Sequence, residues 1–178
     1  MTLDMFKTPL HTPAHLLRDD SIYTVTASTY QQQNFMESNR RKEQWQNAFF
    51  KACQLYQWHI IAWVVLNNHY HIIMRLPEQN AASLPKLIAS LHKFTARQWN
   101  VDDKQPGRKI WWNYWDTCID SEKDFENRLK YVFWNPVKHG LVLRPEEYNF
   151  SSYRDFMTKS NTLFPIDSTI EANDVPEF

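Results

Sequence analysis

The sequence has very little glycine, with only Gly107 and Gly140 among 178 residues. Glycine-rich loops that hold dinucleotides or nucleotide phosphates need two or three glycines close together, so both loop types are excluded. Cysteine is equally scarce: Cys53 and Cys118 cannot build a disulfide framework. The longest apolar run, residues 60–66, falls far short of the roughly 20 residues that cross a bilayer as a helix. Residues 1–17 do not resemble a signal peptide, so we expect a reduced, cytoplasmic protein without membrane contacts.

Aromatic residues, in contrast, are abundant. They make up 15% of the chain, including 8 Trp, and 43% of all residues are hydrophobic. A chain of this length and composition can bury one core, which excludes intrinsic disorder as its main state. The formal net charge is zero, but residues 1–109 hold 13 Lys and Arg against 8 Asp and Glu, and residues 110–178 hold 7 against 12. The basic part suits an anionic partner, although the split is also compatible with an ordinary solvated surface.

The pattern along the chain predicts one domain with two extensions. Residues 1–20, which include Pro9 and Pro13, are predicted to form an irregular arm. Residues 21–157 contain the hydrophobic patterns of strands and helices and are predicted to form the domain. Residues 158–178 read as an acidic tail, because four acidic residues and no Lys or Arg follow position 159. Two interpretations of the tail stay open: it folds back over the basic surface, or it is an inert extension.

Hydrophobic periodicity predicts an α+β fold. Segments with β-branched or helical patterns are expected to form strands at 21–29, 58–66 and 69–76 and helices at 38–56, 84–99 and 121–134. Residues 110–119 are ambiguous between strand and helix. Only Asn67-Asn68 separates the second and third strands, so they must be antiparallel. The order predicts an antiparallel sheet with helices packed mainly on one face.

Two histidines stand two positions apart in the third predicted strand. Residues i and i+2 of a strand point to the same face, so His69 and His71 present their imidazoles side by side, with Tyr70 pointing the other way. Neighbouring imidazoles form half of a divalent-metal site. A pair of surface histidines on an edge strand is the alternative.

The densest aromatic cluster is the segment 110–116. Core packing explains it most simply, whereas a functional interpretation makes it a stacking surface for unpaired bases. Tyr114 within it is a candidate nucleophile. A phenol is weakly nucleophilic at neutral pH and needs a metal-polarised electrophile or a base beside it.

Four stretches, taken together, resemble the REP-associated tyrosine transposases, which belong to the single-tyrosine HUH transposases. In the HUH motif, U is a bulky apolar residue, and Tyr70 matches it. The resemblance extends from about residue 22 to residue 156. The stretches that carry it are NHYHIIM at 68–74, WWNYWD at 111–116, YVFWNPVKHGLV at 131–142 and FSSY at 150–153.

The resemblance implies a ferredoxin-like HUH core and an enzyme that cleaves and rejoins single-stranded DNA at REP-type hairpins. His69 and His71 would hold Mg²⁺ or Mn²⁺, and Tyr114 would form a 5′-phosphotyrosine link. Tyr131 is the alternative nucleophile, although it lies on a face of its predicted helix that is expected to pack. The protein would act as a monomer or a homodimer. A third metal ligand is expected, for which the candidates are Asp116, Glu122 and Asn135.

Two positions depart from the family pattern. Leu66-Asn67-Asn68 replaces the usual Met-Pro-Asn before the first histidine, and Thr117 stands where relatives often carry histidine. Two alternative functions therefore stay open: a nucleic-acid-binding module of the same fold without activity, and a plain metal-dependent hydrolase.

The predicted DNA path follows the second helix and the loop after it. Lysines and arginines recur there at helical spacing and then in the loop, and each neutralised phosphate would add salt-dependent affinity. A solvated helix face is the alternative. The predicted DNA-binding residues are Lys93, Arg97, Arg108, Lys109, Trp111 and Trp112, with Lys86 and Lys104 nearby.

Overall fold

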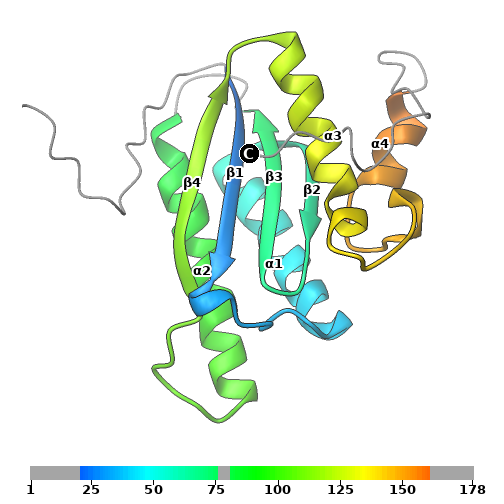
Figure 1. Cartoon of the computed structure of the whole chain (residues 1–178). Coiled ribbons are helices and arrows are strands. Elements are labelled where there is room, and N and C mark those ends of the chain that lie inside the picture. The colour runs from blue at the N-terminus through cyan, green and yellow to red at the C-terminus, as the bar shows by residue number, and fades with distance from the viewer. Residues whose placement is uncertain (1–20, 76–80, 161–178) are drawn as a thin grey trace, which may run out of the picture.

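The computed structural model describes residues 21–75 and 81–160. These residues form four strands and four α-helices, with three short 3₁₀ turns (Figure 1). The strands are β1 (Ile22–Thr29), β2 (His59–Val65), β3 (His69–Arg75) and β4 (Trp111–Ile119). The helices are α1 (Asn39–Tyr56), α2 (Leu84–Asp102), α3 (Glu122–Lys138) and α4 (Tyr153–Ser160). Their order along the chain is β1-α1-β2-β3-α2-β4-α3-α4.

The strands form one antiparallel sheet in the order β2-β3-β1-β4. A tight turn at Asn67-Asn68 joins β2 to β3, closed by a 2.9 Å hydrogen bond from the Leu66 amide to the His69 carbonyl. The Lys42 side chain, which is buried, donates to the Asn67 side chain at 2.9 Å and so fixes this turn against α1. The turn and β1 place the two histidines of β3 in the middle of the sheet.

Helices α1 and α2 cover one face of the sheet and lie behind it in Figure 1. Their apolar residues recur at helical spacing and meet every second residue of the strands, because strand side chains alternate between faces. This larger core contains Tyr70, Ile72 and Met74 of β3, together with Trp45 and Trp99 from the helices. Burial of these large side chains provides the main stabilisation of the fold.

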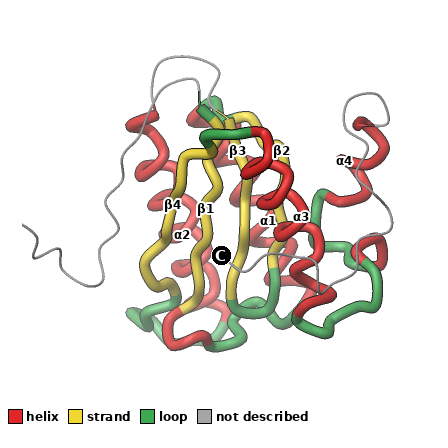
Figure 2. The backbone as a smooth tube through the Cα atoms, turned by 45° about the horizontal axis from the view of Figure 1, so that its top comes forward, coloured by secondary structure: helices red, strands yellow, loops and turns green. Residues whose placement is uncertain are grey.

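The opposite face carries a smaller core beneath α3 and α4. Ala62, Val64 and Ile73 pack there against Val132 and Phe133 of α3. Helix α3 lies over the β2–β3 half of this face (Figure 2), and a cavity lined by residues of β1, β4 and α3 lies beside it. The even-numbered positions of β1 and the odd-numbered positions at 69–73 of β3 belong to this second face, so the histidine pair faces α3.

The α+β antiparallel fold predicted from the sequence is confirmed, and α3 and α4 add a partial layer on the second face. The ambiguous segment 110–119 is strand β4. The helix expected to end near residue 134 continues to Lys138, with Pro136 inside its last turn, where the proline lacks the N–H that would otherwise bond to the Val132 carbonyl. Among the described residues, no helix is long and apolar enough to cross a membrane. The predicted arm at 1–20 and all but the first residues of the acidic tail lie outside the described residues.

Candidate metal and nucleophile site

The His69 and His71 side chains lie next to each other, with ring centroids 5.1 Å apart. Both point to the α3 side of the sheet, as predicted from their spacing, while Tyr70 between them is buried in the larger core. His71 is 4% exposed. An edge-strand pair of solvated histidines is therefore excluded, since β3 is an interior strand.

Each imidazole is held through its Nδ1 atom. His71 Nδ1 lies 2.7 Å from Thr26 Oγ1, and His69 Nδ1 lies 2.7 Å from Asn68 Oδ1. When Nδ1 carries the proton in these contacts, the Nε2 lone pair is left available, which is the tautomer that metal-ligating histidines use. His71 Nε2 is buried and has no hydrogen-bond partner among the described residues. The chain thus orients two Nε2 atoms toward α3.

Burial keeps both histidines neutral at ordinary pH. Desolvation lowers the pKa of His69 to about 4, although the contact with Asn135 acts in the opposite direction. Desolvation also lowers the pKa of His71 well below its ordinary value, and the neighbouring His69 and His139 contribute further. A neutral imidazole is the form that binds a cation.

Asn135 of α3 completes the polar cluster. Its side chain is fully buried, and its Oδ1 lies 3.2 Å from His69 Nε2. If His69 Nδ1 donates to Asn68, His69 Nε2 carries no proton and faces Asn135 Oδ1, which is also an acceptor. A cation bound between these two acceptor atoms would stabilise the arrangement. Two imidazole nitrogens and one amide oxygen therefore fit a divalent ion. The His139 ring lies edge-on to the His69 ring, with centroids 4.9 Å apart, but within residues 21–75 and 81–160 no three His, Cys, Asp or Glu side chains are arranged to hold a metal ion together.

The structure separates the other two predicted third ligands from the histidines. Asp116 pairs with Val25 across β1 and β4, which places it on the α1–α2 side of the sheet. Glu122 lines a different cavity at the N-terminus of α3, together with Ile22 and Phe125. Only Asn135 of the three candidates contacts the histidine pair.

Tyr131 of α3 also reaches this cluster. Its ring lies edge-on to the His71 ring, with centroids 4.9 Å apart, and both residues line a cavity of about 440 Å³. Residues four apart on a helix share a face, so Tyr131 and Asn135 lie one turn apart. That distance matches the spacing between His71 and His69 on β3, since two strand residues and one helical turn both span roughly 5–7 Å.

Tyr114 lies on the other face of the sheet. It pairs with Ala27, which in turn pairs with Tyr70, and all three belong to the α1–α2 side. Burial raises the pKa of Tyr114 to about 12, and the charge of Asp116 contributes. The structure therefore does not bring the predicted nucleophile to the histidine pair. The alternative, Tyr131, is the tyrosine that it places there.

A β-bulge determines which face of the sheet each side chain of β4 meets. Three residues of β1, from Ala27 to Thr29, oppose four of β4, from Tyr114 to Trp111. The additional residue reverses the alternation of side chains along β4. Trp111 and Tyr114 consequently share the core side, and Trp115 points to the histidine side opposite Thr26.

The two tryptophans predicted to bind DNA differ in their surroundings. Trp111 is 7% exposed, stacks on His92 and donates from Nε1 to Thr95 at 2.9 Å. It is a core residue and cannot stack on a base. Trp112 is 38% exposed, and the Lys109 ammonium lies 4.0 Å from its ring centroid. Trp112 and Lys109 together form an exposed cationic and aromatic surface.

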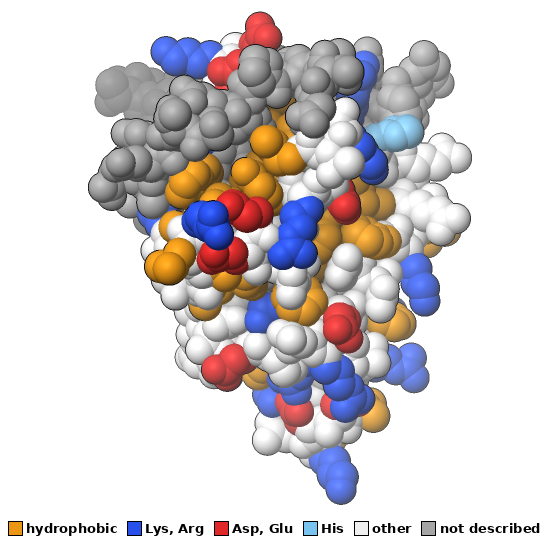
Figure 3. Space-filling model, turned by 90° about the vertical axis from the view of Figure 1, so that its right-hand side faces the viewer, with side chains coloured by type: hydrophobic (Ala, Val, Ile, Leu, Met, Phe, Trp, Pro, Cys, Tyr) orange, Lys and Arg blue, Asp and Glu red, His pale blue; other side chains and the backbone are white. Residues whose placement is uncertain are grey.

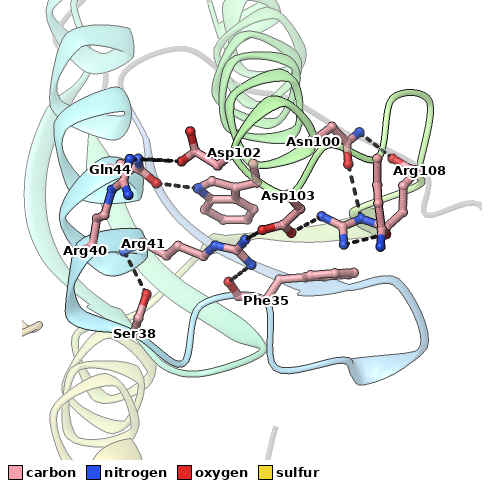
Figure 4. A network of polar contacts seen from close by, with 11 residues as sticks. Phe35, Ser38, Arg40, Arg41, Gln44, Asn100, Asp102, Asp103 and Arg108 are labelled. Atoms are coloured by element: carbon pink, nitrogen blue, oxygen red, sulfur yellow. Dashed lines mark hydrogen bonds and ion pairs between the residues drawn. The ribbon is translucent and has the colours of Figure 1, made fainter.

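Arg108 belongs to a structural network that joins α1, the end of α2 and the loop before β4 (Figure 4). Its guanidinium donates to Asn100 and Gln105 and forms an ion pair with Asp103, which Arg41 also binds. Hydrogen bonds from Arg108 and Arg41 hold the pKa of Asp103 below its ordinary value. Arg108 thus has a structural role, and its predicted role in DNA binding would be additional to it.

Lys93 and Arg97 are exposed on α2, on the opposite side of the sheet from the histidines. The view onto α3 and α4 shows basic and acidic side chains intermixed on the visible described surface (Figure 3). DNA binding by Lys93 and Arg97 stays a prediction.

Comparison with known proteins shows the family of this chain and its fold. The family described as "Transposase IS200 like" matches residues 19–132, more than half of the chain. The chain belongs to the IS200-like transposase family. It is 34% identical over 125 residues to the "REP-associated tyrosine transposase" of Escherichia coli, covering 67% of this chain and 66% of that relative. A Haemophilus influenzae protein, named provisionally in the same way, is 30% identical over 118 residues and matches over 62% of this chain and 67% of its own length.

Solved structures give the same fold for this IS200-like family member. A REP-associated tyrosine transposase bound to a REP hairpin superposes with a TM-score of 0.76, covering 95% of both chains at 22% identity. A tRNA(His) guanylyltransferase from Saccharomyces cerevisiae gives a TM-score of 0.50 at 11% identity, covering 87% of this chain and 76% of that one. Because the fold recurs in an enzyme of different chemistry, function must be argued from the site.

Proposed function

We propose that the protein cleaves and rejoins single-stranded DNA at REP-type hairpins, with Tyr131 as the nucleophile. The observation that carries the proposal is the contact of the Tyr131 ring with His71, whose buried Nε2 has no protein partner among the described residues. Tyr114 is separated from this site by the sheet itself. The substrate class is supported by the relatives, one of which is named for REP association and one of which was solved with a REP hairpin.

His69, His71 and Asn135 would hold the divalent ion, either Mg²⁺ or Mn²⁺. Their neutral imidazoles and amide oxygen supply three donors of the kind that divalent cations accept. When bound, the ion would act as a Lewis acid toward the scissile phosphate and orient it. Thr26 and Asn68 keep the two imidazoles in the required tautomer through their 2.7 Å contacts with Nδ1.

In this proposal, Tyr131 Oη attacks the phosphorus atom of the scissile phosphodiester, and the bond from phosphorus to the 3′-oxygen breaks. The phenolic proton leaves to solvent, and the departing oxygen takes up a proton. The products are a 5′-phosphotyrosine on Tyr131 and a free 3′-hydroxyl. The Lys138 ammonium, 5.6 Å from the centroid of the Tyr131 ring, places positive charge beside the developing phenolate. Attack by a 3′-hydroxyl reverses the step and rejoins DNA without an external energy source.

Two matched tyrosine variants test the proposal. We expect Tyr131→Phe to abolish the covalent protein–DNA band that forms with a fluorescent REP-type hairpin carrying a single-stranded flank. Tyr114→Phe should retain the band, because that side chain lies on the opposite face of the sheet. Both changes remove one hydroxyl and keep the ring, so a difference between them reports chemistry and not bulk packing.

Each other outcome points to a different function. A covalent band that survives in Tyr131→Phe but disappears in Tyr114→Phe would show that Tyr114 of β4 is the nucleophile. Hairpin binding without a band in the wild-type protein would indicate the DNA-binding module without activity. Cleavage without a covalent band, lost on chelation, would indicate a metal-dependent hydrolase.

A further inference from the structure

The cavity beside Tyr131 extends away from the histidines across β1 and β4. Its volume is about 440 Å³, within the range of small-ligand sites. The floor consists of side chains from the second face of the sheet, and α3 forms one wall. The lining residues are Thr24, Thr26, His71, Trp115, Thr117, Arg128 and Tyr131.

Trp115 is the largest side chain in this cavity that is open to solvent. It is 45% exposed, although an indole in a sheet normally gains stability from burial. Its cross-strand neighbour is Thr26, whose other neighbour is His71. The three residues thus form one row across β4, β1 and β3. With adjacent strands about 4.8 Å apart, Trp115 lies roughly 10 Å from the backbone of His71.

The rest of the cavity is polar. Thr24 and Thr117 are directly opposite each other on β1 and β4, and each hydroxyl can both donate and accept a hydrogen bond. Arg128 enters from α3, where its Nε donates to both oxygens of Asp124 at 3.0 Å. This ion pair fixes the Arg128 guanidinium at the cavity wall. The cavity therefore combines His71 and Tyr131 at one end, an ion-paired arginine on its wall, hydroxyl groups along its floor and an exposed aromatic ring.

We infer that this cavity binds the nucleobase next to the scissile phosphate, stacked on the Trp115 ring. The inference rests on the proposed function, because it requires the phosphate to lie between Tyr131 and the histidine pair. A nucleotide anchored there by its phosphate can place its base only over the open part of the sheet, since α3 covers the β2–β3 half. Threonine hydroxyls at 24 and 117 then contact the base edge. Trp115 is accordingly a residue that positions the DNA strand and selects for a stacked base.

The first experiment combines abasic DNA with a tryptophan variant. We expect the wild-type protein to lose roughly tenfold in cleavage rate when an abasic site replaces the base on one side of the scissile phosphate, since stacking one base contributes about 1–3 kcal/mol. Trp115→Ala should lose a similar factor with intact DNA and nothing further with the abasic strand. Trp115→Phe should keep most of the discrimination. Phe94→Ala is the control, because Phe94 is a similarly exposed aromatic residue on α2.

The second experiment measures the stack without cleavage. In the Tyr131→Phe background, 2-aminopurine at the same position of the strand should be quenched on binding, and the added Trp115→Ala change should restore its fluorescence. Equal tolerance of abasic sites on both flanks by the wild-type protein, or equal losses in wild type and Trp115→Ala, would overturn the inference. The proposed function fails separately, through a covalent band in Tyr131→Phe, and the fluorescence result does not depend on cleavage.

Discussion

At the scale of single residues, the proposed chemistry depends on two neutral imidazoles held at their Nδ1 atoms. Thr26 and Asn68 were not among the residues selected from the sequence, yet they orient both rings. A threonine in a strand usually signals only β propensity. Its partner, 45 positions away, is brought beside it by the pairing of β1 with β3.

We expect His71→Ala and His69→Ala each to abolish cleavage and the binding of Mn²⁺, while hairpin affinity stays within about twofold, because phosphate and base contacts elsewhere carry the DNA. His59→Ala is the control, since His59 is exposed on β2. Calorimetry with Mn²⁺ and gel-shift titration with the hairpin measure the two effects. Unchanged cleavage by His71→Ala, with and without chelator, would remove the metal from the mechanism.

His92 gives the fold a pH dependence that is separate from the metal site. Burial lowers its pKa to about 3, and its Nε2 lies 2.9 Å from the Tyr70 hydroxyl. In the unfolded chain His92 becomes protonated as the pH falls through about 6.5, whereas in the folded chain it stays neutral until about pH 3. The folded state therefore loses stability as the pH falls below about 6.5. From pH 7 to pH 5, the loss attributable to His92 is about 2 kcal/mol.

Denaturant titrations across this pH range test the prediction with His92→Gln, which keeps a polar partner for Tyr70 but does not titrate. The variant should be less stable than the wild type at pH 7, because the stacked contact with Trp111 is altered. Its stability should then fall less steeply on acidification. Parallel curves for the two proteins would contradict the assignment of this proton to His92.

At the scale of elements, the ends of α1 offer a clean test of local backbone chemistry. Gln57 caps this helix in the left-handed conformation with φ 59°, and the Trp58 amide bonds back to the Cys53 carbonyl at 2.9 Å. Glycine adopts this conformation without strain. We expect Gln57→Gly to raise the free energy of unfolding by roughly 0.5–1 kcal/mol. Gln54→Gly, within the helix, should lower it by a similar amount, and two equal losses would contradict the account.

The sequence predicts elements well where one periodicity holds throughout. Strand β3 alternates without interruption, so His69 and His71 were placed correctly on one face and Tyr70 on the other. Strand β4 has an additional residue between Trp111 and Tyr114, and alternation alone cannot reveal a bulge that only pairing with β1 creates. The choice of Tyr114 as nucleophile rested on the family resemblance, which does not show on which face of the sheet a residue lies, and the structure places Tyr114 on the α1–α2 side.

Helix α3 illustrates a signal that the sequence did contain. Tyr131 and Asn135 stand four residues apart, and a helix that presents both to one side matches the spacing of the histidine pair. The position of Tyr131 in the middle of the predicted helix suggested a packing face instead, and Leu129, Val132 and Phe133 do pack. One face of α3 packs in the smaller core, and another presents Tyr131 and Asn135 to the histidines. The sequence alone does not show which residues belong to which face, because that depends on where α3 lies over β2 and β3.

At the scale of the whole molecule, one chain supplies every group of the site. Tyr131, Asn135 and both histidines come from the same copy, through the packing of α3 on β2 and β3. Exchange of α3 between two copies is not required. The proposed site is therefore complete in a monomer.

Mixing two inactive variants tests this arrangement. Tyr131→Phe supplies the histidines, and His71→Ala supplies the tyrosine. We expect the mixture to give no covalent product, since neither copy holds a complete site. The specific rate of the wild-type protein should also be independent of its concentration. Recovery of activity in the mixture would mean that α3 serves the site of a second copy.

The most direct test of the central claim is to identify the tyrosine that becomes linked to DNA. The wild-type protein is trapped on a nicked or short-flanked hairpin substrate with Mn²⁺, digested with protease and nuclease, and sequenced by mass spectrometry. The account predicts a nucleotide attached to Tyr131, in the peptide that continues through Asn135. Attachment to Tyr114, or an adduct on any other residue, would contradict it.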